Sequence, residues 1–134
     1  MKSKAMGKHK GNRYENKIYD ELRKRNVFVR KSKGSGNAED NKGDLETNNL
    51  LIECKHYKKV TDKLIVKWMQ KIYNEAIPIG KYPLLIVKEN YKEPRVYYYN
   101  KDMEISYLTY QFWLDNALMD EVNTVKKEIP SYIG

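Results

Sequence analysis

The sequence predicts one α/β domain, in which a central mixed β-sheet is flanked by helices. Three observations support this prediction. The chain has 134 residues, close to the usual size of a single domain. Helical and strand-like periodicities alternate along it, and no internal repeat or long linker divides it. One sheet covered by helices is the economical way for a chain of this length to bury its apolar faces. We therefore expect a basic, flexible arm at residues 1–11 and a single domain at residues 12–134.

Three segments have the features of helices. Residues 12–25 begin with a capping residue, Asn12, and carry Glu15 three positions later, as in a capping box. Residues 62–76 and 108–127 carry apolar side chains at helical spacing, so each predicts an amphipathic helix. The apolar positions that support these predictions are Tyr14, Ile18 and Leu22 in the first segment, Leu64, Trp68 and Ile72 in the second, and Leu114, Leu118, Val122 and Val125 in the third.

Shorter segments rich in β-branched and apolar residues predict strands at 27–30, 44–47, 50–55, 84–88 and 95–99. Asn48 and Asn49 separate the second strand from the third, and adjacent asparagines tolerate the positive φ that tight hairpin turns require. Residues 31–43 are rich in glycine, serine and asparagine, which predicts a loop. The predicted order is helix, three strands, helix, two strands, helix.

Charge and cysteine content narrow the possible functions. The formal charge is +8 and the pI is about 9.4, so a polyanion, above all nucleic acid, is the leading partner. The alternative is a lysine-rich surface that only keeps the protein in solution. Cys54 is the only cysteine in the sequence, which excludes an internal disulfide and a multi-cysteine zinc site. The two histidines are too few for a histidine-rich site, so we expect any metal to be a hard cation held by carboxylates.

Other classes of protein are not indicated. No apolar run approaches the ~20 residues that span a bilayer, and the basic N-terminus lacks the apolar stretch of a secretory signal. The sequence has neither a phosphate-binding loop nor a dinucleotide-binding fingerprint. We therefore expect an intracellular, cytoplasmic protein that binds neither a membrane nor a nucleotide cofactor.

The most specific signal lies between Gly43 and Lys55. Side chains alternate between the two faces of a strand, so Leu51, Glu53 and Lys55 share one face. The residues of the other face, Leu50, Ile52 and Cys54, fit a core. Charged groups beside a core are costly unless they are paired or bind something. Asp44 lies on the neighbouring strand across a short hairpin, so a suitable register brings its carboxylate close to Glu53.

Two carboxylates and a lysine around one point suit phosphodiester hydrolysis. Carboxylates bind Mg²⁺ through oxygen, and the metal lowers the pKa of a water. Lys55 can orient or deprotonate that water, or stabilise the transition state. The alternative for Glu53 and Lys55 is an exposed ion pair of little energetic value. Glu46 shares a face with Asp44 and is an alternative ligand. Further carboxylates in the preceding loop are Glu39 and Asp40.

These motifs resemble the PD-(D/E)XK nuclease superfamily, and within it the small Holliday junction resolvases of archaea and related phage or viral proteins. Asp44, Glu53 and Lys55 match the catalytic trio of that family, although Gly43 stands where the family name specifies proline. The similarity covers roughly residues 11–88. It includes residues 11–15, which resemble the N-terminal helix motif, and the serine- and glycine-rich segment at residues 34–36.

The resemblance implies a restriction-endonuclease-like core and a Mg²⁺-dependent endodeoxyribonuclease, with Mn²⁺ as a possible substitute. It also implies a homodimer that binds four-way DNA junctions in recombination and repair and cuts them symmetrically. The implied catalytic residues are Glu15, Asp44, Glu53 and Lys55, and the first three would bind the metal. Two alternatives remain: another PD-(D/E)XK nuclease of the restriction or repair type, or a non-catalytic, basic nucleic-acid-binding protein.

We expect DNA contacts from Arg13, Arg30, Lys33, Ser35, Lys58 and Gln70. Lys58 has the alternative of simply facing water, and Ser35 that of an ordinary loop serine. Candidate dimer surfaces are the tyrosine-rich strand at residues 97–99 and the last helix with Phe112 and Trp113. The alternative is that these aromatic residues complete the core of the monomer.

Overall fold

The structure, a computed structural model, describes the backbone of residues 2–32 and 44–117 and the side chains of residues 13–32 and 44–117. The helices are α1 (Lys2–Lys24), α2 (Asp62–Ala76), the 3₁₀ turn η2 (Ile77–Ile79), α3 (Tyr110–Phe112) and the π-helical turn η3 (Trp113–Ala117). The strands are β1 (Val29–Lys31), β2 (Leu45–Thr47), β3 (Leu50–Tyr57), β4 (Tyr82–Glu89), β5 (Arg95–Tyr99) and β6 (Ile105–Thr109).

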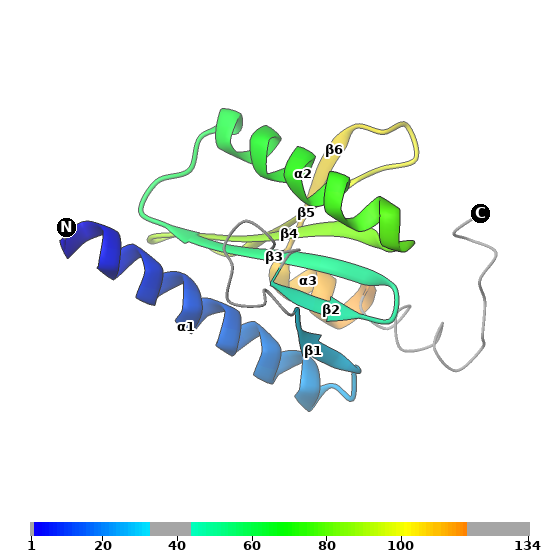
Figure 1. Cartoon of the computed structure of the whole chain (residues 1–134), viewed down its shortest axis with the longest axis horizontal. Helices are drawn as coiled ribbons and strands as arrows, with labels where there is room; N and C mark the ends of the chain where they lie inside the picture. Colours follow the sequence, from blue (N-terminus) through cyan, green and yellow to red (C-terminus); the bar gives the residue numbers. More distant parts are fainter. Residues whose placement is uncertain (1, 33–43, 118–134) are drawn as a thin grey trace.

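The six strands form one mixed sheet in the order β1-β2-β3-β4-β5-β6. All neighbouring pairs are antiparallel except β3 and β4, which are parallel and are connected through α2. In Figure 1, α1 lies along one side of the sheet and α2 along the other. The predicted α/β class, a mixed sheet flanked by helices as in a restriction-endonuclease-like core, is therefore confirmed.

Two hydrophobic cores cover the two faces of the sheet. The first lies between α1 and the sheet and includes Ile18, Ile52 and Cys54. The second lies between α2 and the sheet and includes Leu51 and Ile72. The predicted alternation of β3 is therefore correct, because its successive apolar side chains belong to different cores. Burying both faces of β3 makes it a rigid base for the charged residues that it carries.

Helix α2 has the predicted bounds. It begins after Thr61, whose side-chain oxygen accepts a hydrogen bond from the backbone N–H of Leu64 at 3.2 Å. Its predicted apolar face is confirmed at Trp68 and Ile72, which are buried. The chain then turns at Gly80, which has a φ of 72° that suits glycine.

Helix α1 begins at Lys2 and not at Asn12, so residues 2–11, expected to form a flexible arm, continue the helix. Lysine, alanine and methionine, which have high helix propensity, make up most of this segment. Their propensity outweighs the cost of Gly7 and Gly11 in the helix interior. Asn12 therefore lies inside the helix and does not cap it.

The hairpin between β2 and β3 is present, but its turn is not the one expected. Among the described residues, positive φ occurs at Asn26, Tyr91, Met103 and Gly80, and not at the two asparagines. The hydroxyl of Thr47 instead accepts hydrogen bonds from the backbone N–H groups of Asn49 at 3.2 Å and Leu50 at 3.0 Å. A side-chain oxygen thus closes this turn without a left-handed residue.

The C-terminal prediction was wrong at its start. Residues 105–109 form β6, paired antiparallel with β5, so Leu108 lies in a strand. The turn before β6 is held by Asn100, whose side-chain oxygen accepts from the backbone N–H groups of Asp102 and Glu104. Local asparagine chemistry and strand pairing therefore override the helical spacing. The helix begins after Thr109, its N-cap, and residues 118–127 of the predicted helix lie outside the described residues.

The aromatic residues proposed for a dimer surface contribute mainly to the monomer. Trp113 is buried in the first core, Tyr98 packs against that core, and Tyr97 and Tyr99 pack against the second. Phe112 is exposed. No helix in the described part of the chain combines the length and apolar character needed to cross a membrane.

Candidate active site

The carboxylate of Asp44 is fixed where β3 extends beyond β2. The β2–β3 register pairs Leu45 with Ile52, so Asp44, just before β2, lies opposite Glu53. The backbone N–H of Asp44 donates to the carbonyl of Ile52 at 2.7 Å, and its Oδ2 accepts from the backbone N–H of Cys54, also at 2.7 Å. The aspartate therefore caps the exposed edge of β3, and its carboxylate stands beside that strand.

Glu53 is a buried acid between two lysines. Its side chain is 8% exposed, and its Oε2 lies 3.2 Å from Nζ of Lys55. Its Oε1 lies 3.8 Å from Nζ of Lys71, too far for a hydrogen bond, and has no hydrogen-bond partner in the structure. Burial excludes the alternative of an exposed ion pair. A buried carboxylate oxygen without a hydrogen bond is costly and is suited to a cation.

The acids crowd one another electrostatically. Burial, followed by the charge of Glu53, raises the pKa of Asp44 to about 7, although the Cys54 N–H opposes the shift. Burial also raises the pKa of Glu15 on α1; the charge of Lys31 opposes this, and that of Glu53 adds to it. Because Glu15 also raises the pKa of Asp44, the carboxyl groups of Glu15, Asp44 and Glu53 act on one another electrostatically, and we refer to these three residues as the acidic cluster.

Helix α2 packs against the candidate site and contributes Trp68, together with Lys71 and Glu75, which the sequence did not single out. Lys55 lies with its Nζ 5.3 Å from the ring centre of Trp68, a cation–π contact. Lys71 contacts Glu53 and also binds Glu75, with Nζ 3.1 Å from Oε2. Burial opposes its charge, but the two glutamates together raise the pKa of Lys71. The spacing of Trp68, Lys71 and Glu75 along one side of the helix was a signal for this contact.

Glu46, the alternative ligand, is instead held in an ion triad. Its Oε2 lies 2.8 Å from Nζ of Lys81, and its Oε1 lies 3.1 Å from the guanidinium of Arg30. Burial opposes the charge of Glu46, but these two cations lower its pKa overall. Lys81 also donates to the carbonyl of Thr47 at 2.6 Å. Glu46 therefore joins β1, β2 and the start of β4, and this role accounts for its charge.

The residues expected to contact DNA lie on different elements: Arg13 on α1, Arg30 on β1, Lys58 just after β3 and Gln70 on α2. Arg13, Lys58 and Gln70 are exposed, whereas Arg30, also exposed, is bound to Glu46. Successive helix residues point about 100° apart, so Gln70 does not share the direction of Lys71. The other candidate contacts, Lys33 and Ser35, and the further loop carboxylates, Glu39 and Asp40, lie outside the described residues.

The neighbours of the cluster have structural roles. Cys54 is buried, and burial raises the pKa of its thiol, as expected of a core residue. His56 lies within β3. Its Nε2 is 3.2 Å from Oδ1 of Asn90, and its ring meets that of Tyr14 edge-on at 5.6 Å.

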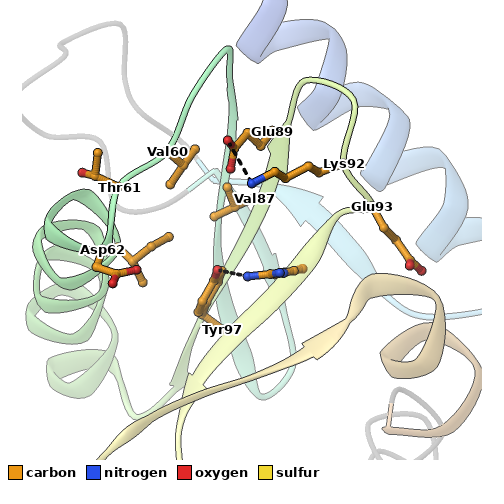
Figure 2. A pocket seen from close by; sticks show the side chains of 10 residues that line it. Val60, Thr61, Asp62, Val87, Glu89, Lys92, Glu93 and Tyr97 are labelled. Carbon is orange, nitrogen blue, oxygen red and sulfur yellow. Dashed lines mark hydrogen bonds and ion pairs between the residues drawn. The ribbon is translucent and has the colours of Figure 1, made fainter.

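A pocket of about 160 Å³ lies near the start of α2, against β4 and β5 (Figure 2). It begins one strand away from the cluster, since Val87 in its wall pairs with Lys55 in the sheet. None of the four candidate catalytic residues lines it. Its charged groups include Glu89 and Lys92, whose side chains lie 3.5 Å apart. This pocket is therefore separate from the acidic cluster.

Within residues 13–32 and 44–117, whose side chains the structure describes, no three His, Cys, Asp or Glu side chains are already grouped closely enough to hold a metal ion. The chemistry of the cluster nevertheless fits one. Burial, together with the charge of Glu53, raises the pKa values of Asp44 and Glu15, and Glu53 has an oxygen without a hydrogen bond. Oxygen donors of this kind suit a hard divalent cation.

Residues 6–129 match the model of the family described as "phage putative PDDEXK endonuclease". No curated protein matches the chain. The matched range begins within α1 and covers every strand of the sheet and α2. The chain belongs to this phage endonuclease family, and through it to the PD-(D/E)XK nuclease superfamily.

Proposed function

We propose that the chain is a metal-dependent endodeoxyribonuclease whose active site consists of Asp44, Glu53, Lys55 and Glu15. The observation that carries this proposal is the buried Glu53, in contact with Lys55 and facing acids whose pKa values are raised. A fold maintained only for stability would neutralise such acids, as it does Glu46. Buried acids with raised pKa values are typical of catalytic sites.

Asp44 and Glu53 would hold the cation, Mg²⁺ or in its place Mn²⁺, with Glu15 assisting from α1. When bound, the cation supplies positive charge against the scissile phosphate and lowers the pKa of the attacking water. Lys55 orients that water or takes its proton, and its ammonium form stabilises negative charge on the phosphate. Trp68 limits the positions of the amine through their cation–π contact.

In this proposal Lys71 is the counter-ion of Glu53 in the metal-free protein. Its Nζ is 3.8 Å from Glu53 and 3.1 Å from Glu75, so Glu75 would still hold the lysine with a cation bound at Glu53. The charge of Lys71 beside Glu53 stabilises the metal-free site. Lys71 also leaves an ammonium group near the bound phosphate.

The substrate that we propose is branched DNA, foremost the four-way junction. The net charge of +8 supports a DNA partner. A homodimer would match the twofold symmetry of a junction with two active sites. Exposed Phe112 and the edge strand β6 are the surfaces that we propose for this contact. Another cleavage specificity, of the restriction or repair type, is the alternative.

The test is to incubate the chain with a four-way junction, a linear duplex and a single strand, each with Mg²⁺ or Mn²⁺. We expect cleavage of the junction near its branch, and none by D44N. Light scattering of the same samples measures whether the chain is a dimer. Equal cutting of all three DNAs would refute the junction preference alone. No cutting with either metal, together with no Mn²⁺ binding by calorimetry, would refute the nuclease proposal.

A further inference from the structure

Tyr57, the last residue of β3, carries a ring that is partly open to solvent. Its side chain is 42% exposed. Side chains two residues apart share a face of a strand, so Tyr57 follows Glu53 and Lys55 along the face that carries the proposed active site. An aromatic ring left open beside catalytic groups is a surface on which a ligand can pack.

The position of this ring is fixed by Trp68. The two ring centres are 4.9 Å apart with their planes inclined by 57°. Trp68 is buried, and its ring also carries the ammonium group of Lys55, 5.3 Å from its centre. One buried indole therefore holds both the proposed catalytic amine and the exposed tyrosine, and their relative position is set by the core.

The backbone under Tyr57 is fixed as well. Its residue pairs with Glu89 in the parallel β3–β4 ladder, and its carbonyl accepts a hydrogen bond from the backbone N–H of Asn90 at 3.1 Å. The ring thus projects from the sheet itself and not from a loop. Along the strand, Tyr57 lies roughly 7 Å beyond Lys55, about one nucleotide away from a phosphate at that amine.

We propose that Tyr57 is a stacking platform for an unpaired base next to the scissile phosphate. This inference rests on the proposed nuclease function and makes its substrate more specific. A tyrosine ring stacks on any base, because every base has an aromatic face. Lys58 and Lys59, both exposed, follow directly and can bind the adjoining phosphates. The platform therefore selects for a base outside the double helix and not for a base sequence.

Bases inside a continuous duplex are already stacked on their neighbours, so they gain little from Tyr57. At a branch point, bulge or frayed end, a base lacks such a neighbour, and the ring can replace it. The proposed site would then place Lys55 at a phosphate whose neighbouring base is unpaired. This gives a physical reason for a preference for distorted DNA over continuous duplex.

The experiment measures binding in EDTA, where no cleavage occurs, to a duplex with one bulged 2-aminopurine and to the matching continuous duplex. Four variants separate stacking from packing: Tyr57→Phe and Tyr57→Trp keep an aromatic plane, Tyr57→Leu covers Trp68 without one, and Tyr57→Ala removes both. Tyr82→Leu is the control. Tyr82 is also 42% exposed, but it begins β4, roughly 20 Å away along the same strand pair.

We expect Tyr57→Leu and Tyr57→Ala to weaken binding to the bulged duplex by about tenfold or more and to leave the continuous duplex unchanged. The wild-type chain and the Phe and Trp variants should quench the 2-aminopurine fluorescence, and the Leu variant should not. Equal binding and quenching by the wild type and Tyr57→Leu would overturn the inference. Because these signals need no catalysis, an inactive chain would refute the nuclease proposal without affecting them.

Discussion

Asp44 lies just before β2 and Glu46 lies two residues later within that strand, yet their carboxyl groups have opposite electrostatic environments. Glu46 lies between Lys81 and Arg30, and these cations lower its pKa. Burial and the charge of Glu53 raise the pKa of Asp44 to about 7. The comparison separates an acid whose charge is neutralised by two cations from an acid whose charge is not, at the position where we propose that a metal ion binds.

The lysines near these acids also differ in how closely their ammonium groups are paired. Lys81 forms an ion pair with Glu46 and also donates a hydrogen bond to a backbone carbonyl. Lys55 and Lys71 share one buried carboxylate, and neither contact is a short, isolated pair. Neutralised charge is expected where only stability matters, whereas charge left incompletely neutralised is expected where a cation or phosphate will arrive.

The largest expected effect is on the rate of DNA cleavage, and it distinguishes Glu53 on β3 from Glu46 on β2. Replacing Glu53 with Gln removes a proposed metal ligand and should reduce the rate of DNA cleavage by on the order of a thousandfold or more. Replacing Glu46 with Gln should change that rate by less than about threefold, because its carboxylate faces Lys81 and Arg30. Single-turnover cleavage rates at saturating Mg²⁺ measure both. Comparable losses in the two variants would abolish the distinction between the acids.

The next expected effect is a pH-dependent gain of stability in Asp44→Asn. An acid whose pKa is 3.8 when unfolded and about 7 when folded binds its proton more tightly in the folded state. The folded state then holds more protons between these pH values, so stability falls as pH rises from about 4 to about 7 and is level above. The amide side chain of the variant lacks this penalty and can still accept the Cys54 N–H.

Urea denaturation in EDTA at about pH 8 should therefore show Asp44→Asn to be more stable than the wild type by roughly 2–4 kcal/mol. At about pH 4 the two should be nearly equal. Glu46→Gln is the matched comparison, because its acid has a lowered pKa. A wild-type protein whose stability rises between these pH values, with no gain from the Asp44→Asn substitution, would mean that Asp44 is neutralised as Glu46 is.

How much of this arrangement the sequence predicted depends on the range of the interaction. The alternation of β3, and hence the shared face of Glu53 and Lys55, follows from strand geometry and was predictable. The bounds of α2 were predictable because Thr61, a strong capping residue, precedes an amphipathic run. The β2–β3 turn was predicted for the wrong reason, because the hydroxyl of Thr47 competes with the conformational freedom of the asparagines.

Long-range partners were not predictable from local patterns. Nothing near Glu46 in the sequence indicates that its charge is neutralised by Lys81, which directly precedes β4, two strands across the sheet from β2. For the same reason Glu46 remained an alternative metal ligand until the fold was known. Strand β6 was missed because its pairing with β5 depends on the Asn100 turn. Lys71 was within reach of sequence reasoning, since it shares a side of α2 with Trp68.

A smaller effect is expected on the stability role of Glu46. Glu46→Gln leaves Lys81, whose side chain is 17% exposed, without its carboxylate partner. We expect a loss of about 1–3 kcal/mol in the free energy of unfolding, measured by urea denaturation near neutral pH. Replacing Lys81 with Met in the same variant should recover part of the loss, because no uncompensated charge then remains. A Glu46→Gln protein as stable as the wild type would show that the triad is not what holds these strands.

The smallest expected effect concerns lysines that face solvent beside the proposed site. Lys58 is exposed and follows Tyr57, whereas Lys101 is exposed in the turn between β5 and β6. If Lys58 neutralises a DNA phosphate, Lys58→Gln should lower the slope of log affinity against log salt by about 1. Lys101→Gln should leave that slope unchanged. Binding to a junction over a range of salt concentrations in EDTA measures both slopes. Equal slopes in the two variants would assign Lys58 to the solvated surface, and the DNA path would then have to be sought on the other side of the acidic cluster, along α1.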